Sequence, residues 1–158
     1  KFEGVNRRFS FLSSYNGIKV YDDYGHHPVE IRATLSAARE VAKNKVVAVV
    51  QPHRYSRLKM LFADFTTAFN DADTVFITDI YSAGENELAD ISKENLISAL
   101  ISGGHKDARD FENLEKLETF VKDNLGEGDL IIFLGAGDIT QYARKFSDLL
   151  KGVEKSNA

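Results

Sequence analysis

The sequence predicts an α/β domain: a Rossmann-like, three-layer fold with a mostly parallel sheet. Three short runs rich in apolar residues, at 45–51, 74–78 and 129–134, have the composition of strands buried on both faces. Segments with apolar residues three and four positions apart separate them, as in amphipathic helices. Strands that alternate with helices form a parallel sheet with helices on both faces. At 158 residues the chain is long enough for one domain, which we place at residues 1–150.

The first two strands are expected to form an antiparallel hairpin. Asn16-Gly17 favours a two-residue type I′ turn between strand-like segments at 9–15 and 18–23. A short, weak strand candidate at 106–110 brings the expected sheet to about six strands.

Recognisable signals begin or end the predicted helices. Pro28 suits the first turn of a helix, and Ser92 is a good N-cap. Gly103-Gly104 and Gly126 are expected to end two others. The predicted helices cover residues 28–43, 55–69, 92–101, 114–125 and 138–150. The polar segment 151–158 is expected to fray.

Composition excludes several classes of function. The net charge of −4 argues against a general nucleic-acid surface. The absence of cysteine excludes disulfides, thiolate nucleophiles and Cys-ligated zinc. No apolar run approaches the roughly 20 residues that span a bilayer, and no signal-like segment appears, so we expect a cytoplasmic protein without membrane partners. The chain begins at Lys1 directly in strand-like sequence, which suggests part of a longer protein.

Polar residues concentrate at the carboxyl ends of the predicted strands. Residues 21–28 read Tyr-Asp-Asp-Tyr-Gly-His-His-Pro, and residues 51–57 read Gln-Pro-His-Arg-Tyr-Ser-Arg. These two turns contain both prolines and three of the four histidines of the chain. Ligands of such sheets bind at this edge. The two turns are therefore expected to form one face of an active site.

The first turn is compatible with more than one chemistry. The Asp22 and Asp23 carboxylates suit ribose hydroxyls or a hydrated Mg²⁺ ion, and His26 and His27 could orient phosphate or exchange protons near neutral pH. The alternative is a polar loop whose Asp and His side chains cap the next helix. A zinc site is poorly supported, because adjacent histidines rarely both reach one ion in a tight turn.

The second turn favours an anion. Arg54 and Arg57 lie three residues apart at the start of a predicted helix, whose N-terminus also attracts negative charge. A carboxylate or phosphate is the expected ligand. In the loop at 81–85, Glu85 could contact a ligand or belong to a plain loop.

Residues 135–138, Gly-Ala-Gly-Asp, resemble half of a dinucleotide-binding fingerprint, but Thr140 stands where the third glycine would be. A tight turn with Asp138 as N-cap is the better account. The sequence contains neither a Gly-x-x-x-x-Gly-Lys-Ser/Thr phosphate loop nor a Gly-x-Ser-x-Gly nucleophile motif. A phosphate cradle is therefore not in this chain, and we assign no catalytic residue and no metal ligand.

Taken together, in order and spacing, five motifs resemble the C-terminal domain of the Mur ligases, in the form found in the alanine-adding branch of that family. The resemblance covers about residues 4–150. The motifs are Gly4-Val-Asn-Arg-Arg-Phe9, Asp22-Asp-Tyr-Gly-His-His-Pro28, Gln51-Pro-His-Arg-Tyr-Ser-Arg57, Tyr81-Ser-Ala-Gly-Glu85 and Gly135-Ala-Gly-Asp-Ile139.

The resemblance implies a three-domain, ATP-dependent ligase of peptidoglycan synthesis, and hence of cell-wall formation, cell shape and cell division. In such an enzyme ATP phosphorylates the carboxylate of UDP-N-acetylmuramate, and the amine of L-alanine attacks the acyl phosphate. The N-terminal and central domains bind the UDP-sugar and ATP with Mg²⁺. The domain represented here would then be inactive alone.

Residue roles follow from the same resemblance. Arg8 and Asp23 would contact ATP, Asp23 through the ribose hydroxyls. The pocket for L-alanine would have the two arginines on the carboxylate. Its expected lining is Tyr24, His26, His53, Arg54 and Arg57.

Two other functions stay open from the residues alone. One is a stand-alone, Rossmann-like nucleotide-binding module that uses residues 135–138. The other is a metal-dependent hydrolase that uses Asp22, Asp23 and the histidines.

Overall fold

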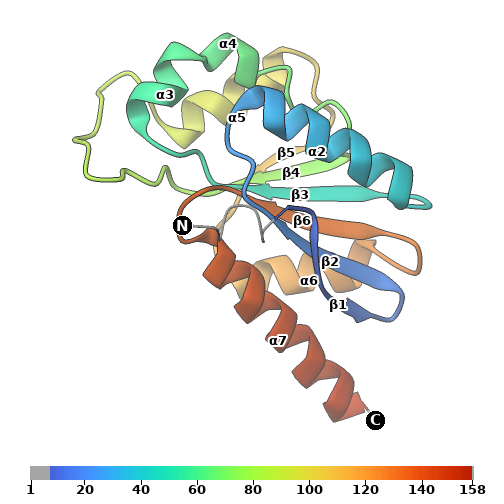
Figure 1. The fold of residues 1–158 in the computed structure, drawn as a ribbon. Helices are drawn as coiled ribbons and strands as arrows, with labels where there is room; N and C mark the ends of the chain where they lie inside the picture. Colours follow the sequence, from blue (N-terminus) through green and yellow to red (C-terminus); the bar gives the residue numbers. More distant parts are fainter. Residues whose placement is uncertain (1–7, 158) are drawn as a thin grey trace.

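The computed structural model describes residues 8–157, with side chains for residues 8–152. It has the expected three layers around a six-stranded sheet of order β1-β2-β6-β3-β4-β5 (Figure 1). Only β1 is antiparallel to its neighbour. The strands are β1 (Ser10–Tyr15), β2 (Ile18–Asp23), β3 (Val46–Val50), β4 (Thr74–Ile77), β5 (Ala108–Asp110) and β6 (Leu130–Leu134).

The N-terminal hairpin has the predicted turn. Asn16 and Gly17 have φ angles of 51° and 82°, and Tyr15 pairs with Ile18 across them. Positive φ at both central residues is the requirement of a type I′ turn, which an asparagine followed by a glycine meets at little cost.

Strand β6 lies between β2 and β3, and all five of its side chains are buried. The parallel register places Leu134 opposite both Asp23 and Val50, and Val50 opposite Ile77. Asp110 of β5 lies opposite Ile77 in turn, so five parallel strands end at one edge of the sheet. The polar turns that follow them therefore start side by side.

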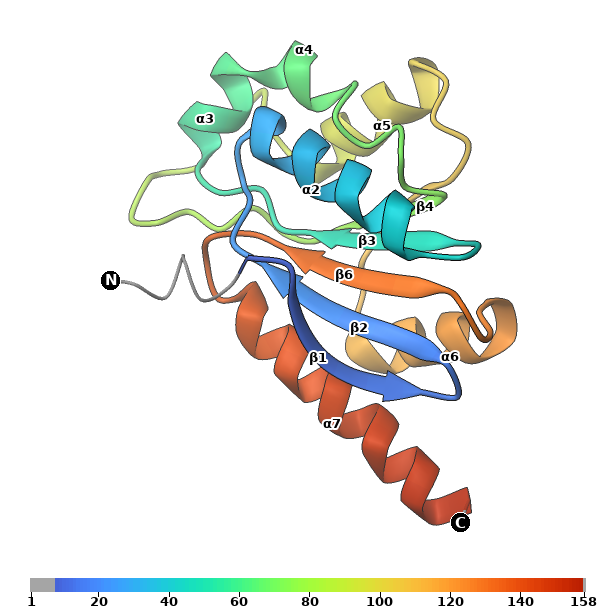
Figure 2. The same ribbon diagram turned by 45° about the vertical axis from the view of Figure 1, so that its right-hand side comes forward.

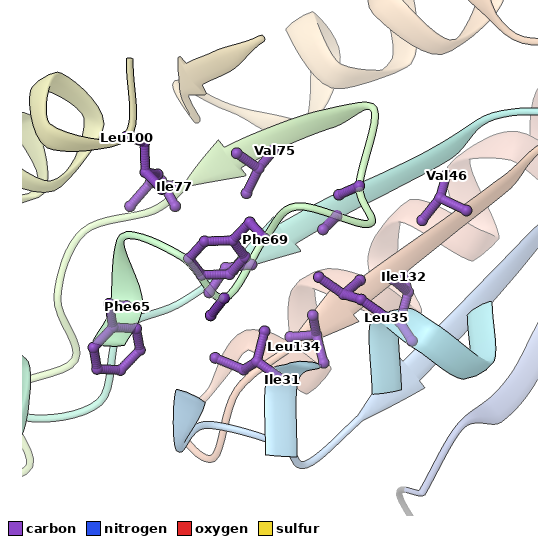
Figure 3. Packing of buried hydrophobic residues seen from close by; sticks show 14 of the residues in the cluster. Ile31, Leu35, Val46, Phe65, Phe69, Val75, Ile77, Leu100, Ile132 and Leu134 are labelled. Carbon is purple, nitrogen blue, oxygen red and sulfur yellow. The ribbon is translucent and has the colours of Figure 1, made fainter. Parts of the chain in front are cut away.

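The helices cover both faces of the sheet. Helices α2 to α5 lie on one face and α6 and α7 on the other, as Figures 1 and 2 show. Figure 3 shows Ile31 and Leu35 of α2 beside Leu134 and Ile132 of β6. The helices are α2 (Pro28–Val41), α3 (Tyr55–Met60), α4 (Phe62–Phe65), α5 (Lys93–Ser102), α6 (Leu114–Asn124) and α7 (Ile139–Asn157).

The prediction of one helix over residues 55–69 is wrong. The helix breaks at Leu61, whose φ and ψ of −110° and 21° are not helical. Beyond α4, the Thr66 and Thr67 hydroxyls donate to the carbonyls of Ala63 and Asp64. Such local bonds compete with the α-helical ladder, and the chain continues in turns closed by i to i−3 hydrogen bonds. Phe65 and Phe69 are both buried, so the apolar spacing reflected the core rather than a continuous helix.

The last helix is longer than predicted. It continues beyond Leu150 to Asn157, so the expected frayed tail is helical over most of its length. Within residues 8–157, none of the helices combines the length and apolar character needed to cross a bilayer.

The Asp73 carboxylate and its partners Val46, Arg39 and Lys106, here called the latch, join the amino ends of β3 and β4. Asp73 accepts hydrogen bonds from the Val46 N–H (2.8 Å), from Arg39 (2.5 Å) and from Lys106 (2.9 Å). Burial raises the pKa of the Asp73 carboxyl, but the hydrogen bonds from Arg39 and Lys106 outweigh it and lower the pKa from 3.8 to about 2.

Asp73→Asn is expected to destabilise the domain in a pH-dependent way. A depressed carboxyl pKa stabilises the fold above the unfolded value of 3.8, and this contribution is lost as the pH falls towards 2. The stability difference from wild type should be about 2 kcal/mol at neutral pH. It should shrink when urea unfolding is repeated below the unfolded pKa. The control is Asp71→Asn, an exposed carboxylate two residues away, and a gap independent of pH would contradict the latch.

Candidate functional site

Backbone hydrogen bonds hold the carboxyl-end turns together. Gly135 N–H donates to the Asp23 carbonyl (3.1 Å), Gln51 N–H to the Leu134 carbonyl (3.0 Å) and Thr78 N–H to the Val50 carbonyl (2.9 Å). These bonds extend the sheet by one step beyond its last paired residues. The two turns at 21–28 and 51–57 therefore meet, as the sequence predicts.

Four half-buried aromatic rings form a row across this edge. The ring centroids of Tyr24 and His26 lie 5.2 Å apart, those of His26 and His53 5.5 Å, and those of His53 and Tyr81 5.4 Å. The first pair is edge to face and the last is stacked. Tyr24, His26 and His53, predicted to share a pocket, are thus brought together. Tyr81 was not predicted as a member.

The hydrogen-bond partners define which nitrogen of each imidazole carries the proton. His53 Nδ1 lies 3.2 Å from Arg57 Nη1, and a guanidinium only donates, so Nδ1 accepts and Nε2 carries the hydrogen. His26 Nδ1 lies 3.1 Å from the Tyr24 carbonyl, which only accepts, so Nδ1–H donates and Nε2 is free of its proton in the neutral ring.

The surroundings of His53 favour its neutral form. Burial lowers the pKa of the His53 imidazole below its ordinary 6.5, and the charges of His26, Arg57 and Arg54 lower it further. The Glu85 carboxylate opposes them only in part. An uncharged ring beside two guanidinium groups can donate from Nε2 without adding positive charge.

The expected anion site at the start of α3 needs a correction. The Ser56 N–H and hydroxyl donate to the Glu85 carboxylate, at 3.0 and 2.5 Å. Glu85 therefore caps α3, and part of the helix N-terminus is already bound to negative charge. Arg54 is exposed and Arg57 is half-buried against His53, so the guanidinium groups are what this turn offers an incoming anion.

Asp23 is tied into the chain rather than open to solvent. Its side chain accepts from the N–H groups of Phe9 and Gly25, each at 2.7 Å, and the residue is only 2% exposed. Burial raises the pKa of the Asp23 carboxyl, against the opposing effect of these hydrogen bonds. Arg8 lies 3.9 Å from Asp23 and 3.4 Å from Glu30, with about half of its side chain exposed. Arg8 is thus the accessible member of the predicted ATP-contacting pair.

His27 has the capping role that the sequence left as an alternative. Its Nδ1 accepts from Val29 N–H (3.2 Å), and Glu30 accepts from the N–H of His26 and of His27 (3.2 Å each). This capping box fixes the start of α2, and so the position of the Tyr24–His26 segment before it.

The 135–138 turn is packed against the other loops. Gln51 donates to the Asp138 carboxylate (2.7 Å) and accepts from Ile139 N–H (3.3 Å), so Gln51 rather than Asp138 binds this first N–H of α7. A Cβ on Gly137 would lie 2.6 Å from both the Tyr81 ring and Gln51 Oε1. Glycine is required here because the Gln51 and Tyr81 side chains occupy the space that a Cβ would need.

The remaining carboxylates do not assemble a metal centre. Asp22 accepts from the Thr140 hydroxyl (2.7 Å), while Asp23 binds backbone N–H groups. Across the described part of the chain, no three His, Cys, Asp or Glu side chains are placed to hold one ion. The two carboxylates invoked by the metal-dependent hydrolase hypothesis are thus both hydrogen-bonded within the chain.

Comparison with known proteins decides the family. The family model for the Mur ligase, glutamate ligase domain, matches residues 7–137. The chain belongs to the Mur ligase family.

The relatives extend this Mur ligase assignment. A UDP-N-acetylmuramate–L-alanine ligase of Chelativorans is 51% identical over 142 residues, covering 90% of this chain and 30% of the relative. The same-named protein of Agrobacterium fabrum is 50% identical over 152 residues, covering 96% of this chain and 32% of its own length. The chain thus spans about a third of the length of these relatives.

Solved structures agree. The UDP-N-acetylmuramate–alanine ligase of Thermotoga maritima matches with a TM-score of 0.71 at 34% identity, covering 93% of this chain and 30% of its own. A murein peptide ligase of Psychrobacter arcticus, 19% identical with a TM-score of 0.71, covers 91% of this chain and 30% of its own, and shares the fold. The resemblance inferred from the five motifs is confirmed at the level of family and fold.

Two residues of this Mur ligase domain, Tyr81 and Glu85, acquire roles that sequence reasoning missed or left open. Both follow β4, at the edge where the other turns lie, and His53 forms a parallel bridge with Tyr81. Their position after a buried strand was the available signal. The stacking partner and the capped helix depend on contacts between distant segments, which no local pattern encodes.

The His53 imidazole of this Mur ligase domain is expected to titrate below 6.5. Arg57→Ala should raise the His53 pKa, because Arg57 stabilises the neutral ring by donating to Nδ1 and disfavours a second positive charge. The measurement is an NMR titration of the imidazole protons in the 158-residue chain, assigned with His53→Gln.

Lys59→Ala is the matched control, because Lys59 lies on the same helix but pairs with Asp90 at 3.3 Å. It should leave the His53 midpoint nearly unchanged. A wild-type midpoint at or above 6.5, or equal shifts in the two variants, would contradict the assigned environment.

Proposed function

We propose that this domain provides the amino-acid-binding side chains, and some of the ATP contacts, of an ATP-dependent ligase that joins L-alanine to UDP-N-acetylmuramate. The observation that carries the proposal is the row of rings Tyr24, His26 and His53 beside Arg57, built from the motifs of the alanine-adding branch. The 51% identity to a UDP-N-acetylmuramate–L-alanine ligase supports it.

The chemistry of L-alanine fits this arrangement. Its carboxylate requires a donor with fixed geometry, which the planar guanidinium groups of Arg54 and Arg57 provide. Its methyl group needs only a small apolar wall, which ring faces supply. A neutral His53 can lie beside the amine without the repulsion that an imidazolium would add.

Fewer residues of this chain are proposed to contact ATP than to contact L-alanine. Arg8 is exposed and can approach an anionic phosphate or a ribose as it stands. The Asp23 carboxylate accepts hydrogen bonds from the Phe9 and Gly25 N–H groups. It can therefore bind ribose hydroxyls only if the backbone at Phe9 moves and its hydrogen bond to Asp23 breaks. The sequence holds no phosphate loop, so we assign the binding of the ATP phosphates and phosphoryl transfer to another part of the whole ligase.

Among the described residues of this domain, no group of three or more His, Asp or Glu side chains is placed to hold Mg²⁺, which accompanies ATP in phosphoryl transfer. The Asp22 and Asp23 carboxylates are engaged by Thr140 and by backbone N–H groups. We therefore place no metal ligand and no metal-dependent step in this domain.

The 158-residue chain alone is expected to show neither ligase activity nor ATP hydrolysis. The phosphate-binding loop is absent from its sequence, and the side chains proposed for L-alanine form one wall of a site. A coupled assay for ADP, run with UDP-N-acetylmuramate and L-alanine, tests this. Calorimetry with ATP should give weak or no binding. ADP production or tight nucleotide binding would favour a stand-alone nucleotide module.

Arg54→Ala in the whole ligase should raise the KM for L-alanine by about tenfold or more, the size expected for a lost charge-assisted hydrogen bond. The KM for ATP should stay within about twofold, since Arg54 is not expected to contact the nucleotide.

Arg32→Ala is the control. It removes an exposed arginine of α2, whose guanidinium donates a hydrogen bond to the Thr67 hydroxyl. The measurement is steady-state kinetics with L-alanine and with ATP as the varied substrate, which gives both KM values for each variant. An unchanged KM for L-alanine in Arg54→Ala would remove Arg54 from the pocket.

A further inference from the structure

The loop at 79–90 holds the start of α3 through two separate contacts. The first is made by backbone groups around Tyr81. Its N–H donates to the Pro52 carbonyl, and its carbonyl accepts from Arg54 N–H, both at 2.8 Å. The second is made by the Glu85 carboxylate, which accepts from the N–H and hydroxyl of Ser56.

Arg54 lies between these two contacts in an unfavourable backbone conformation. Its φ of 76° and ψ of 133° are outside the regions that residues with a Cβ adopt readily. A conformation of this kind persists only where the surrounding structure enforces it, and it is often found at functional sites. The hydrogen bonds on Arg54 itself and on Ser56, two residues later, are the enforcing contacts here.

The Glu85 carboxylate is charged in this arrangement. Hydrogen bonds from the Ser56 side chain and backbone lower the pKa of Glu85, and the positive charge of Arg54 adds to the effect. An ionised carboxylate is the strongest acceptor available to the first turn of a helix.

We propose that Tyr81 and Glu85 form a clamp that fixes the Arg54–Arg57 turn in its amino-acid-binding geometry, with Glu85 as a positioning residue for the carboxylate of the incoming amino acid. The clamp also supports one end of the row of rings, because the Tyr81 ring stacks on the His53 ring. The identity of the amino acid rests on the proposed function, whereas the clamp rests on the contacts alone.

Without Glu85, the first turn of α3 loses an acceptor and Arg54 can relax to an ordinary φ. Its guanidinium would then leave the position from which it binds a carboxylate. Arg57 keeps its contact with His53, so binding should weaken rather than disappear.

The first experiment measures amide hydrogen exchange by NMR in the 158-residue chain. In Glu85→Ala, exchange at the N–H groups of both Ser56 and Arg54 should accelerate at least tenfold, although the Arg54 N–H donates to the Tyr81 carbonyl and not to Glu85. Glu85→Gln keeps an acceptor oxygen and should restore most of the protection. Glu87→Ala removes an exposed charge from the same loop and should change neither amide. Unaltered exchange at Arg54 in Glu85→Ala would overturn the clamp.

The second experiment measures steady-state kinetics of the whole ligase. Glu85→Ala should raise the KM for L-alanine at least fivefold, with the KM for ATP within twofold and with rescue by Glu85→Gln. If Arg54→Ala raises the KM for L-alanine and Glu85→Ala does not, the clamp is wrong and the proposed function stands. If the exchange result holds and neither variant changes that KM, the clamp stands and the alanine assignment fails.

Discussion

The structure depends on the parallel register of β6 with its two neighbours. Leu134 lies opposite Asp23 on one side and Val50 on the other, and the hydrogen bonds continue into the turns beyond. Every side chain of β6 is buried, so a shift of one residue would exchange the two apolar faces on which α2 and α7 pack. This register brings the turns at 21–28 and 51–57 together at one edge of the sheet.

At this edge the polar residues divide into those that hold the chain and those that face outward. Asp23, Gln51 and Glu85 have internal partners, and each joins two segments that are distant in sequence. Arg8 and Arg54 are exposed. A carboxylate in a binding motif is therefore not necessarily a ligand group. Here the carboxylates set the geometry in which the cationic groups are presented.

Much of the fold could be predicted because its signals are local. Asn16-Gly17 specifies a turn by backbone conformation, and the apolar runs specify buried strands by composition. The break at Leu61 and the cap by Glu85 could not be predicted in this way. Ser56 and Glu85 are 29 residues apart, and their contact exists only because β3 and β4 are neighbours in the sheet. The sequence motifs predicted that the turns at 21–28 and 51–57 lie at one edge of the sheet, whereas the contacts that distinguish structural from exposed residues there required the tertiary structure.

The electrostatics of the turn explain why a capped helix and two arginines occur together. Two guanidinium groups at the start of a helix would repel the positive end of its dipole. The Glu85 carboxylate offsets that repulsion. The lowered pKa of His53 favours its neutral ring, so His53 does not add a positive charge beside Arg54 and Arg57. What remains is positive charge for one carboxylate beside a row of aromatic rings in which His53 is favoured in its neutral form. This pattern matches a small amino acid better than a nucleotide, whose phosphates would need the loop that the sequence lacks. In the proposed ligase, the domain thus recognises the incoming amino acid, while phosphoryl transfer requires another part of the protein.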